Sequence, residues 1–249
     1  MAGISYKILL ISISCSIMLS CATKKGTAPD GGQSSVQREP SPLDPAAPPR
    51  VSIEGLKSDE LVSEARMLEI RVDGYPMAPN WQGFEVVLND QEPQRFHTSP
   101  LAFPLPMEKL RRGANLIKVY LVRSWGESVK VPEAFAVVPF FSESKTGLSW
   151  VAPKRPIMTL VSPRGTYRGE AAKKILFDFM VQNPEKQQKS YKVHYTLNGK
   201  KLELESGKSY FFYNLTPGDY ELRVEVVNAR GIPLGQEVTR NRSVFRIEE

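Results

Sequence analysis

Several stretches of this 249-residue chain place an apolar residue at every second position. Residues 68–72, 175–181 and 220–226 all show this pattern, and in the first and last of them the intervening residues are charged. A period of two with one apolar face is typical of a half-buried β-strand. No stretch beyond residue 50 shows a convincing helical period. We therefore expect an all-β fold.

Beyond residue 50 the chain repeats one order of turns and strands. A turn at 88–90 follows an apolar strand, and a matching turn at 197–199 follows another. In each copy a glycine then introduces a further strand, and a second glycine ends it at the same distance: Gly113 and Gly126, then Gly218 and Gly231. A tandem duplication predicts two immunoglobulin-like β-sandwich domains, at residues 51–142 and 156–249, with residues 143–155 as a linker.

The segment from Leu215 to Tyr220, which reads Leu-Thr-Pro-Gly-Asp-Tyr, resembles the corner of immunoglobulin-like and fibronectin type III domains. In those families a tyrosine early in the penultimate strand bonds back to the backbone of the corner. The resemblance implies this role for Tyr220, with Leu215 as the apolar plug and Gly218 at the turn. The first copy departs from the pattern, because Asn115 stands where the tyrosine would be. The resemblance indicates a fold and no particular ligand.

Residues 1–20 have the layout of a bacterial signal peptide. Lys7 supplies the positive charge, and the apolar run 8–19 is too short to span a bilayer. The run closes on Met-Leu-Ser-Cys at residues 18–21, which resembles the lipobox of bacterial prolipoproteins. One departure is that methionine replaces the usual leucine three places before the cysteine.

The lipobox resemblance implies that Cys21 receives the lipid and becomes the first mature residue. Ala22 follows it where an aspartate would resemble an inner-membrane retention signal, which implies a cell-envelope protein at the outer membrane, with the face left open. Ordinary secretory cleavage is the alternative, because Ser20 and Ala22 also satisfy the rule for small residues. Both cysteines of the chain, Cys15 and Cys21, belong to this region, so the mature protein would form no internal disulfide.

Residues 21–50 are rich in Lys, Gly, Ser, Gln, Asp and Pro. Such a segment buries too little apolar surface to offset the entropy of ordering it. Its prolines favour an extended conformation. We therefore expect a disordered linker that holds the folded part away from the membrane.

Charge is unequal between the two copies. Residues 51–145 carry 11 Lys and Arg against 13 Asp and Glu, a net charge of −2, whereas residues 146–249 carry 17 against 11, a net charge of +6. Nine basic residues of the second copy and its linker form a candidate patch for an anionic polymer or lipid head group: Lys154, Arg155, Arg164, Arg168, Lys173, Lys174, Arg240, Arg242 and Arg246. The alternative is a solvated surface without a ligand. Nucleic acid is not expected, since no recognised binding motif accompanies the charge.

The sequence contains few candidates for catalytic residues. The two histidines, His97 and His194, have no cysteine or carboxylate at the spacing of metal ligands. No nucleophile elbow or phosphate-binding glycine loop is present. The sequence therefore predicts no enzyme activity, no metal and no cofactor.

Three tryptophans are candidates for contacts. Trp81 and Trp125 lie in expected loops and could stack on sugars or anchor a protein partner, or they could cap a core. Trp150 lies in the linker and is expected to pack at the domain junction. Our hypothesis is a non-enzymatic envelope lipoprotein that binds or scaffolds an envelope protein or an anionic glycan. The alternative is a carbohydrate-binding accessory protein that uses Trp81 and Trp125.

Overall fold

A computed structural model describes most of the chain, namely residues 37–38, 48–146, 156–182, 191–235 and 237–249. Within residues 31–249 the chain forms one compact unit. The predicted signal peptide, Cys21 and most of the predicted linker 21–50 lie outside the described residues. No helix among the described residues is long and apolar enough to cross a membrane.

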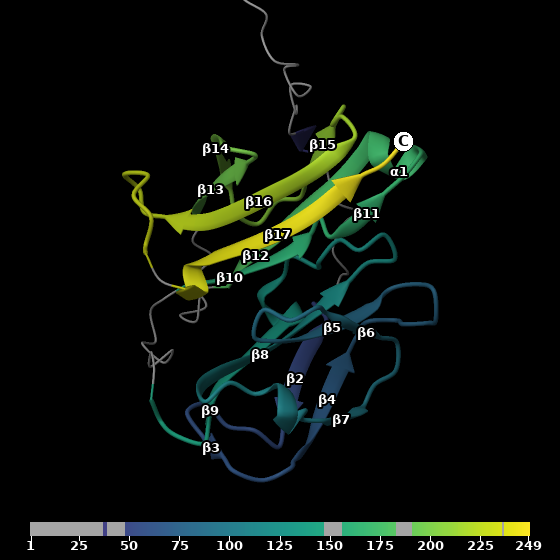
Figure 1. The fold of residues 1–249 in the computed structure, drawn as a ribbon. Coiled ribbons are helices and arrows are strands. Elements are labelled where there is room, and N and C mark those ends of the chain that lie inside the picture. Colours follow the sequence, from purple (N-terminus) through teal and green to yellow (C-terminus); the bar gives the residue numbers. More distant parts are fainter. Residues whose placement is uncertain (1–36, 39–47, 147–155, 183–190, 236) are drawn as a thin grey trace, which may run out of the picture. The chain divides into compact units, whose positions relative to one another are not determined.

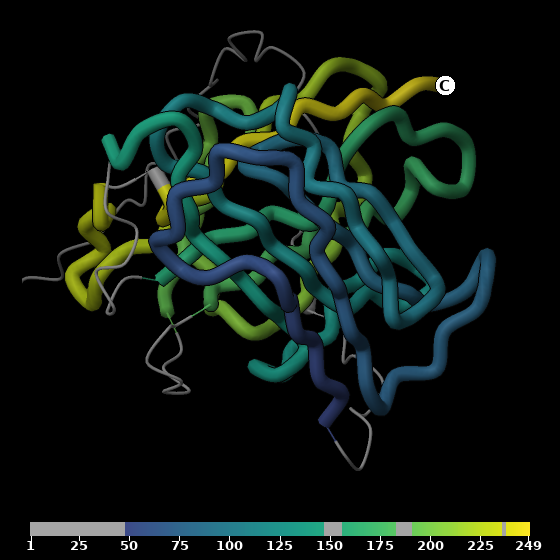
Figure 2. Tube along the Cα trace, turned by 90° about the horizontal axis from the view of Figure 1, so that it is seen from below, coloured from purple at the N-terminus to yellow at the C-terminus, as the bar shows by residue number. Residues whose placement is uncertain are grey.

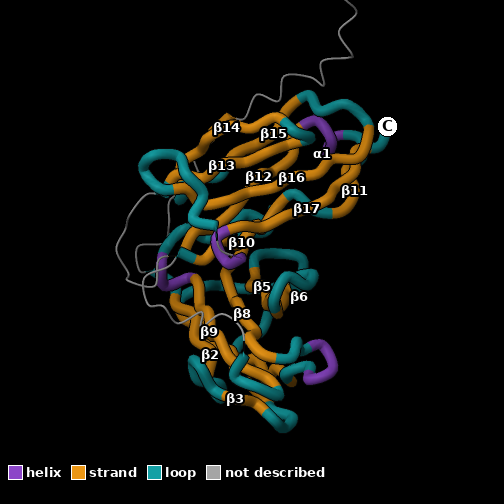
Figure 3. The backbone as a smooth tube through the Cα atoms, turned by 60° about the vertical axis from the view of Figure 1, so that its left-hand side comes forward, coloured by secondary structure: helices purple, strands orange, loops and turns teal. Residues whose placement is uncertain are grey.

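The all-β prediction is confirmed. Strands make up nearly all the regular structure, and helix is confined to short turns (Figure 3). These turns are α1 (Glu170–Lys173) and the 3-10 helices η1 (Met107–Lys109), η2 (Pro132–Ala134) and η3 (Glu237–Thr239).

The first eight strands after the linker form what we call the N-terminal sandwich (Figure 1). They are β2 (Arg50–Glu54), β3 (Leu61–Val62), β4 (Met67–Asp73), β5 (Gly83–Leu88), β6 (Gln94–Phe96), β7 (Leu101–Pro104), β8 (Gly113–Val122) and β9 (Phe135–Ser142). One sheet has the order β2-β4-β7 and the other β3-β9-β8-β5-β6. Side chains from both sheets, among them Leu68, Phe84 and Ile117, meet in one buried core.

The next eight strands form the C-terminal sandwich, green to yellow in Figure 2. They are β10 (Ile157–Ser162), β11 (Gly165–Tyr167), β12 (Lys174–Gln182), β13 (Lys192–Leu197), β14 (Lys200–Glu205), β15 (Tyr210–Tyr213), β16 (Gly218–Val227) and β17 (Arg240–Ile247). One sheet has the order β10-β12-β15 and the other β11-β17-β16-β13-β14. Two residues of the predicted linker, β1 (Gln37–Arg38), add an antiparallel edge strand beside β15.

The two sandwiches have the same strand order, sheet by sheet. In each, the longest strand begins at a glycine with positive φ, Gly113 at 89° and Gly218 at 149°. A side chain at Gly113 would also collide with backbone, because its Cβ would lie 2.5 Å from the carbonyl oxygen of Thr146. A constant offset of 105 residues relates the two from these glycines onward, so Gly113 pairs with Ser142 as Gly218 pairs with Ile247. The shared topology agrees with a tandem duplication.

Candidate functional site

Seven of the nine predicted patch residues are described, and they fall into two groups. One group lies on or next to β11 and β17, which pair in parallel at the edge of their sheet: Arg164, Arg168, Arg240, Arg242 and Arg246. The other lies on α1 and at the start of β12: Lys173 and Lys174. Lys154 and Arg155 lie outside the described residues.

Most of these cations already have a partner. Arg246 holds both carboxylate oxygens of Asp219, at 2.6 and 2.8 Å, and this hydrogen bonding lowers the pKa of Asp219. The other contacts are Arg168 with Glu248 at 2.5 Å, Arg242 with Glu221 at 3.0 Å, Lys173 with Glu170, and the Lys174 amine 4.3 Å from the ring centroid of Phe211. Several of the nine basic residues are therefore paired with neighbouring carboxylates and are not free cations for a ligand.

The two described tryptophans lie at the same end of the N-terminal sandwich. Gly83 at the start of β5 pairs with Val122 at the end of β8, so the loop with Trp81 and the hairpin with Trp125 extend from adjacent strand ends. Each side chain is about half exposed, 48% for Trp81 and 51% for Trp125. The Trp125 indole N–H donates to Glu127 at 2.8 Å. Trp150 lies outside the described residues.

Tyr220 lies at the corner between β15 and β16, with its side chain buried. Its hydroxyl donates to the carbonyl oxygen of Thr216 at 2.8 Å. Leu215 is half-buried and packs against the C-terminal core, and Gly218 begins β16.

The two histidines lie in different sandwiches and have separate neighbours. His194 Nε2 lies 3.3 Å from a Glu203 oxygen, and His97 Nδ1 lies 3.2 Å from the carbonyl oxygen of Gln82. Within the described residues, no three His, Cys, Asp or Glu side chains are placed to hold a metal ion.

The outer face of the five-stranded N-terminal sheet packs against the outer face of β10 and β12. Apolar side chains from both sandwiches form a separate buried cluster there: Val87, Tyr120, Val122, Phe135, Val161 and Met180. We call this contact the junction. The junction explains why Tyr120 is fully buried although it points away from the N-terminal core. The Tyr120 hydroxyl donates to Glu85 at 2.8 Å.

A buried polar network crosses one side of the junction. Asp178 on β12 is fully buried and forms an ion pair with Lys130, from the loop between β8 and β9. The Ser128 backbone N–H donates to Asp178 at 2.7 Å. The Ser209 hydroxyl lies 2.6 Å from Glu127 and 3.1 Å from Asp178, and it can donate its one proton to either carboxylate. These bonds satisfy a carboxylate that would otherwise be costly to bury, and they hold the two sandwiches together.

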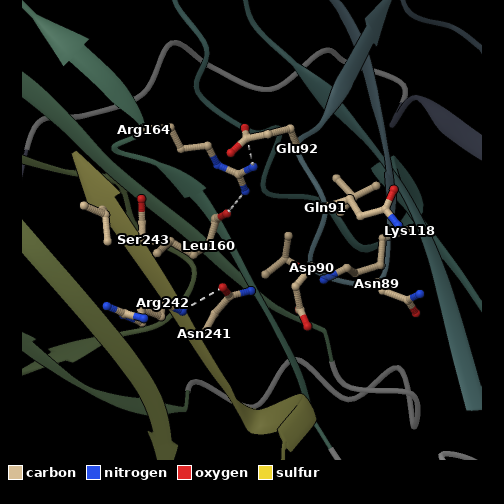
Figure 4. A pocket seen from close by; sticks show the side chains of 13 residues that line it. Asn89, Asp90, Gln91, Glu92, Lys118, Leu160, Arg164, Asn241, Arg242 and Ser243 are labelled. Carbon is tan, nitrogen blue, oxygen red and sulfur yellow. Dashed lines mark hydrogen bonds and ion pairs between the residues drawn. The ribbon is translucent and has the colours of Figure 1, made fainter. Parts of the chain in front are cut away.

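On another side of the junction lies a cavity of about 210 Å³ (Figure 4). Lys118, Asn89 and Gln91 line it from the N-terminal sandwich, whereas Arg164, Asn241 and Ser243 line it from the C-terminal sandwich. The walls are mainly polar. Buried residues such as Lys118 form its inner part, and exposed ones such as Asp90, Glu92 and Arg242 lie at its rim.

Two polar groups in this cavity lack partners. Lys118 is only 2% exposed. Among the described residues its amine has no hydrogen-bond or ion-pair partner. Burial lowers the pKa of Lys118 to about 8; Asp90 opposes this shift and Arg164 adds to it. The Thr159 hydroxyl is also buried, with no hydrogen-bond partner among the described residues. A buried hydroxyl without a partner is costly, so Thr159 favours a ligand or ordered water nearby, and the Lys118 amine at the cavity can bind the same ligand.

The sequence did not predict which strands form the junction, and it did not predict the cavity. A signal was present, because Tyr120 and Val122 make β8 apolar on both faces, as expected of a strand covered on both sides. The equivalent positions in β16 are Glu225 and Val227, and Arg223 stands where Lys118 does. Lys118 itself carried no signal, since a lysine on a strand is most often solvent-exposed.

No family model matches the chain, and no curated protein matches it. Three solved structures that resemble it in part are an extracellular domain from B. thetaiotaomicron (11% identity, TM-score 0.29), three N-terminal domains of the highly immunogenic outer capsid protein Hoc of bacteriophage RB49 (13%, 0.27), and CBD12 of CALX1.2 (10%, 0.22). The matches cover 73%, 80% and 79% of this chain, and 29%, 59% and 99% of those chains. The chain thus spans less than two thirds of the length of the first two.

Proposed function

We propose that the chain is a non-enzymatic binding module of the cell envelope, anchored by a lipid on Cys21, and that its ligand is an anionic glycan. The observation that carries the ligand class is the buried, unpartnered Lys118 in a cavity with polar walls. Amide and hydroxyl groups suit the hydroxyls of a sugar, and a buried cation suits an acidic substituent. The lipid anchor is inferred from residues 18–21 of the sequence. We propose that the lipid inserts into the outer membrane.

The junction supports this function by fixing the cavity in one form. Its walls come from both sandwiches, so any hinge motion between them would change its width. The apolar cluster and the Lys130–Asp178 pair oppose such motion. A site held in shape before binding loses less entropy when the ligand arrives.

Co-sedimentation tests the glycan assignment. The full chain is mixed with insoluble cross-linked polygalacturonate, which carries carboxylates, and with cross-linked dextran, which is neutral. We expect binding to the first polymer alone, weakened at high salt because screening shortens the reach of charge. Binding to neither polymer, with cross-linking in cells to an envelope protein instead, would overturn the glycan assignment.

A second candidate is a carbohydrate-binding protein that uses its tryptophans. The position of Trp81 and Trp125 at adjacent strand ends favours it, because paired exposed rings can stack on a sugar chain. Against it, the Arg123 guanidinium carbon lies 5.7 Å from the Trp125 ring centroid, so one face of that ring has a neighbour. Loss of binding to neutral glycans on Trp81→Ala or Trp125→Ala would support this candidate. Unchanged binding to the carboxylated polymer in the same variants would reject it.

A further inference from the structure

We infer that the junction cavity is a binding site for one carboxylate group, held by the amine of Lys118 and the hydroxyl of Thr159. The inference deepens the proposed function, since it names the part of an anionic glycan that would enter: a sugar with a single carboxylate, such as a hexuronic acid.

Among the charged side chains that line the cavity, all but Lys118 have an ion pair within the described residues. Asp90 pairs with Arg111 at 3.2 Å. Glu92 lies 3.8 Å from Arg164, and that guanidinium also donates to the carbonyl oxygen of Leu160.

The last rim cation, Arg242, lies 3.0 Å from Glu221. Lys118 is therefore the one charged group lining the cavity that has no ion pair within the described part of the chain.

A buried cation without an ion pair suits a ligand with one negative charge. A carboxylate carries that charge, whereas a phosphate monoester carries about −1.5 to −2 at neutral pH and would leave a buried negative excess. A carboxylate also accepts hydrogen bonds on two oxygens. The ammonium of Lys118 can donate to it, and the Thr159 hydroxyl is a second donor without a partner among the described residues.

The size of the cavity agrees with a small ligand. A volume of about 210 Å³ leaves room for more than a single water molecule. The proposed occupant is one carboxylated sugar ring. The exposed rim residues leave a route for the rest of the glycan to continue outside.

The chain offers a matched control for Lys118. Arg223 holds the equivalent position on β16, but it is exposed and pairs with Glu221. The repeat thus presents the same strand position twice, once buried at the junction and once on an open face. Only the buried position has the unpaired cation.

Isothermal titration calorimetry of the full chain with sodium glucuronate, glucose and inorganic phosphate tests the site. We expect glucuronate to bind wild type and Arg223→Met equally, with affinity at least tenfold lower in Lys118→Met and reduced in Thr159→Val. Neither glucose nor phosphate should match glucuronate. Since Lys118→Met removes a buried charge, its unfolding temperature should not fall, and Thr159→Val gives an independent test if it does.

Proton uptake gives a second readout. A bound carboxylate should raise the pKa of Lys118, so binding near pH 8 should take up protons, seen as a heat that depends on the buffer. Asp90, Glu92, Arg164 and Arg242 are the other charged groups at the cavity. Equal binding of phosphate, or glucuronate binding that survives Lys118→Met, would overturn the inference. If no probe binds but the chain still sediments with polygalacturonate, this site is wrong and the proposed function stands.

Discussion

Asn115 and Tyr220 occupy equivalent positions in the two sandwiches and donate hydrogen bonds to equivalent carbonyl oxygens. Asn115 Nδ2 donates to Arg111 at 2.7 Å, as the Tyr220 hydroxyl donates to Thr216 at 2.8 Å. Asn115 also accepts from the Arg111 backbone N–H at 2.9 Å and from Asn89 at 3.0 Å. Asn115, which departs from the tyrosine pattern, thus makes more hydrogen bonds at its corner than Tyr220 does.

Removing the side-chain hydrogen bonds of the two corners should lower the free energy of unfolding by different amounts. Tyr220→Phe removes one hydrogen bond, so we expect the free energy of unfolding to fall by roughly 0.5–1.5 kcal/mol. Asn115→Ala leaves several buried backbone and amide groups without partners, each costing about 1–3 kcal/mol, so its effect should be larger. Urea denaturation of both variants measures this order. An Asn115→Ala variant as stable as wild type would show that the corner bonds contribute nothing.

The buried ion pair between Lys130 and Asp178 should stabilise the junction only as a pair. Lys130→Met leaves the Asp178 carboxylate buried without its cation, and such a loss costs about 3–5 kcal/mol. Adding Asp178→Asn to Lys130→Met should restore part of the lost stability. The midpoints of urea unfolding for the two single variants and the double variant check this. Additive losses in the double variant would argue against coupling across the junction.

The lowered pKa of Lys118 predicts that the free energy of unfolding rises with pH. Its pKa is lowered from 10.5 to about 8 by burial, which means that the folded state binds its proton more weakly than the unfolded chain does. Below about pH 8 the lysine is charged in both states and the full burial penalty applies, on the order of 3 kcal/mol. The penalty decreases as pH rises toward 10.5, because the unfolded chain then binds more protons than the folded one.

The free energy of unfolding should therefore increase between pH 8 and 10.5 more in wild type than in Lys118→Met. Other groups titrate alike in the two proteins, so the difference isolates Lys118. Denaturation at the two ends of this range is the measurement. Identical pH profiles would mean that the amine is solvated in the folded state.

The lipid anchor has a direct test. If Cys21 is acylated, the mature protein should partition into the detergent phase, and Cys21→Ala should release it from membranes or stop its processing. Mass spectrometry of the mature N-terminus distinguishes the possibilities. An N-terminus at Thr23 without lipid mass would show ordinary secretion instead.

The fold could be predicted because its signals are local. Alternation along 68–72 and 220–226, together with glycines at fixed spacing, predicts strands and turns from neighbouring residues alone. The junction could not be predicted as readily, since the burial of Tyr120 depends on strands about 40 and 60 residues further along the chain, β10 and β12. The same limit applies to charge: pairing of Arg246 with Asp219 follows from the register of β16 and β17, which a count of charges does not contain.

Competition on the carboxylated polymer tests the central claim, that the junction cavity binds the acidic sugar of a glycan, most directly. The full chain is first bound to cross-linked polygalacturonate at low salt, and free sodium glucuronate or glucose is then added. The account predicts that glucuronate releases wild-type protein, that glucose does not, and that Lys118→Met binds the polymer weakly from the start. Wild-type protein that stays bound at saturating glucuronate, or Lys118→Met that binds as tightly as wild type, would contradict it.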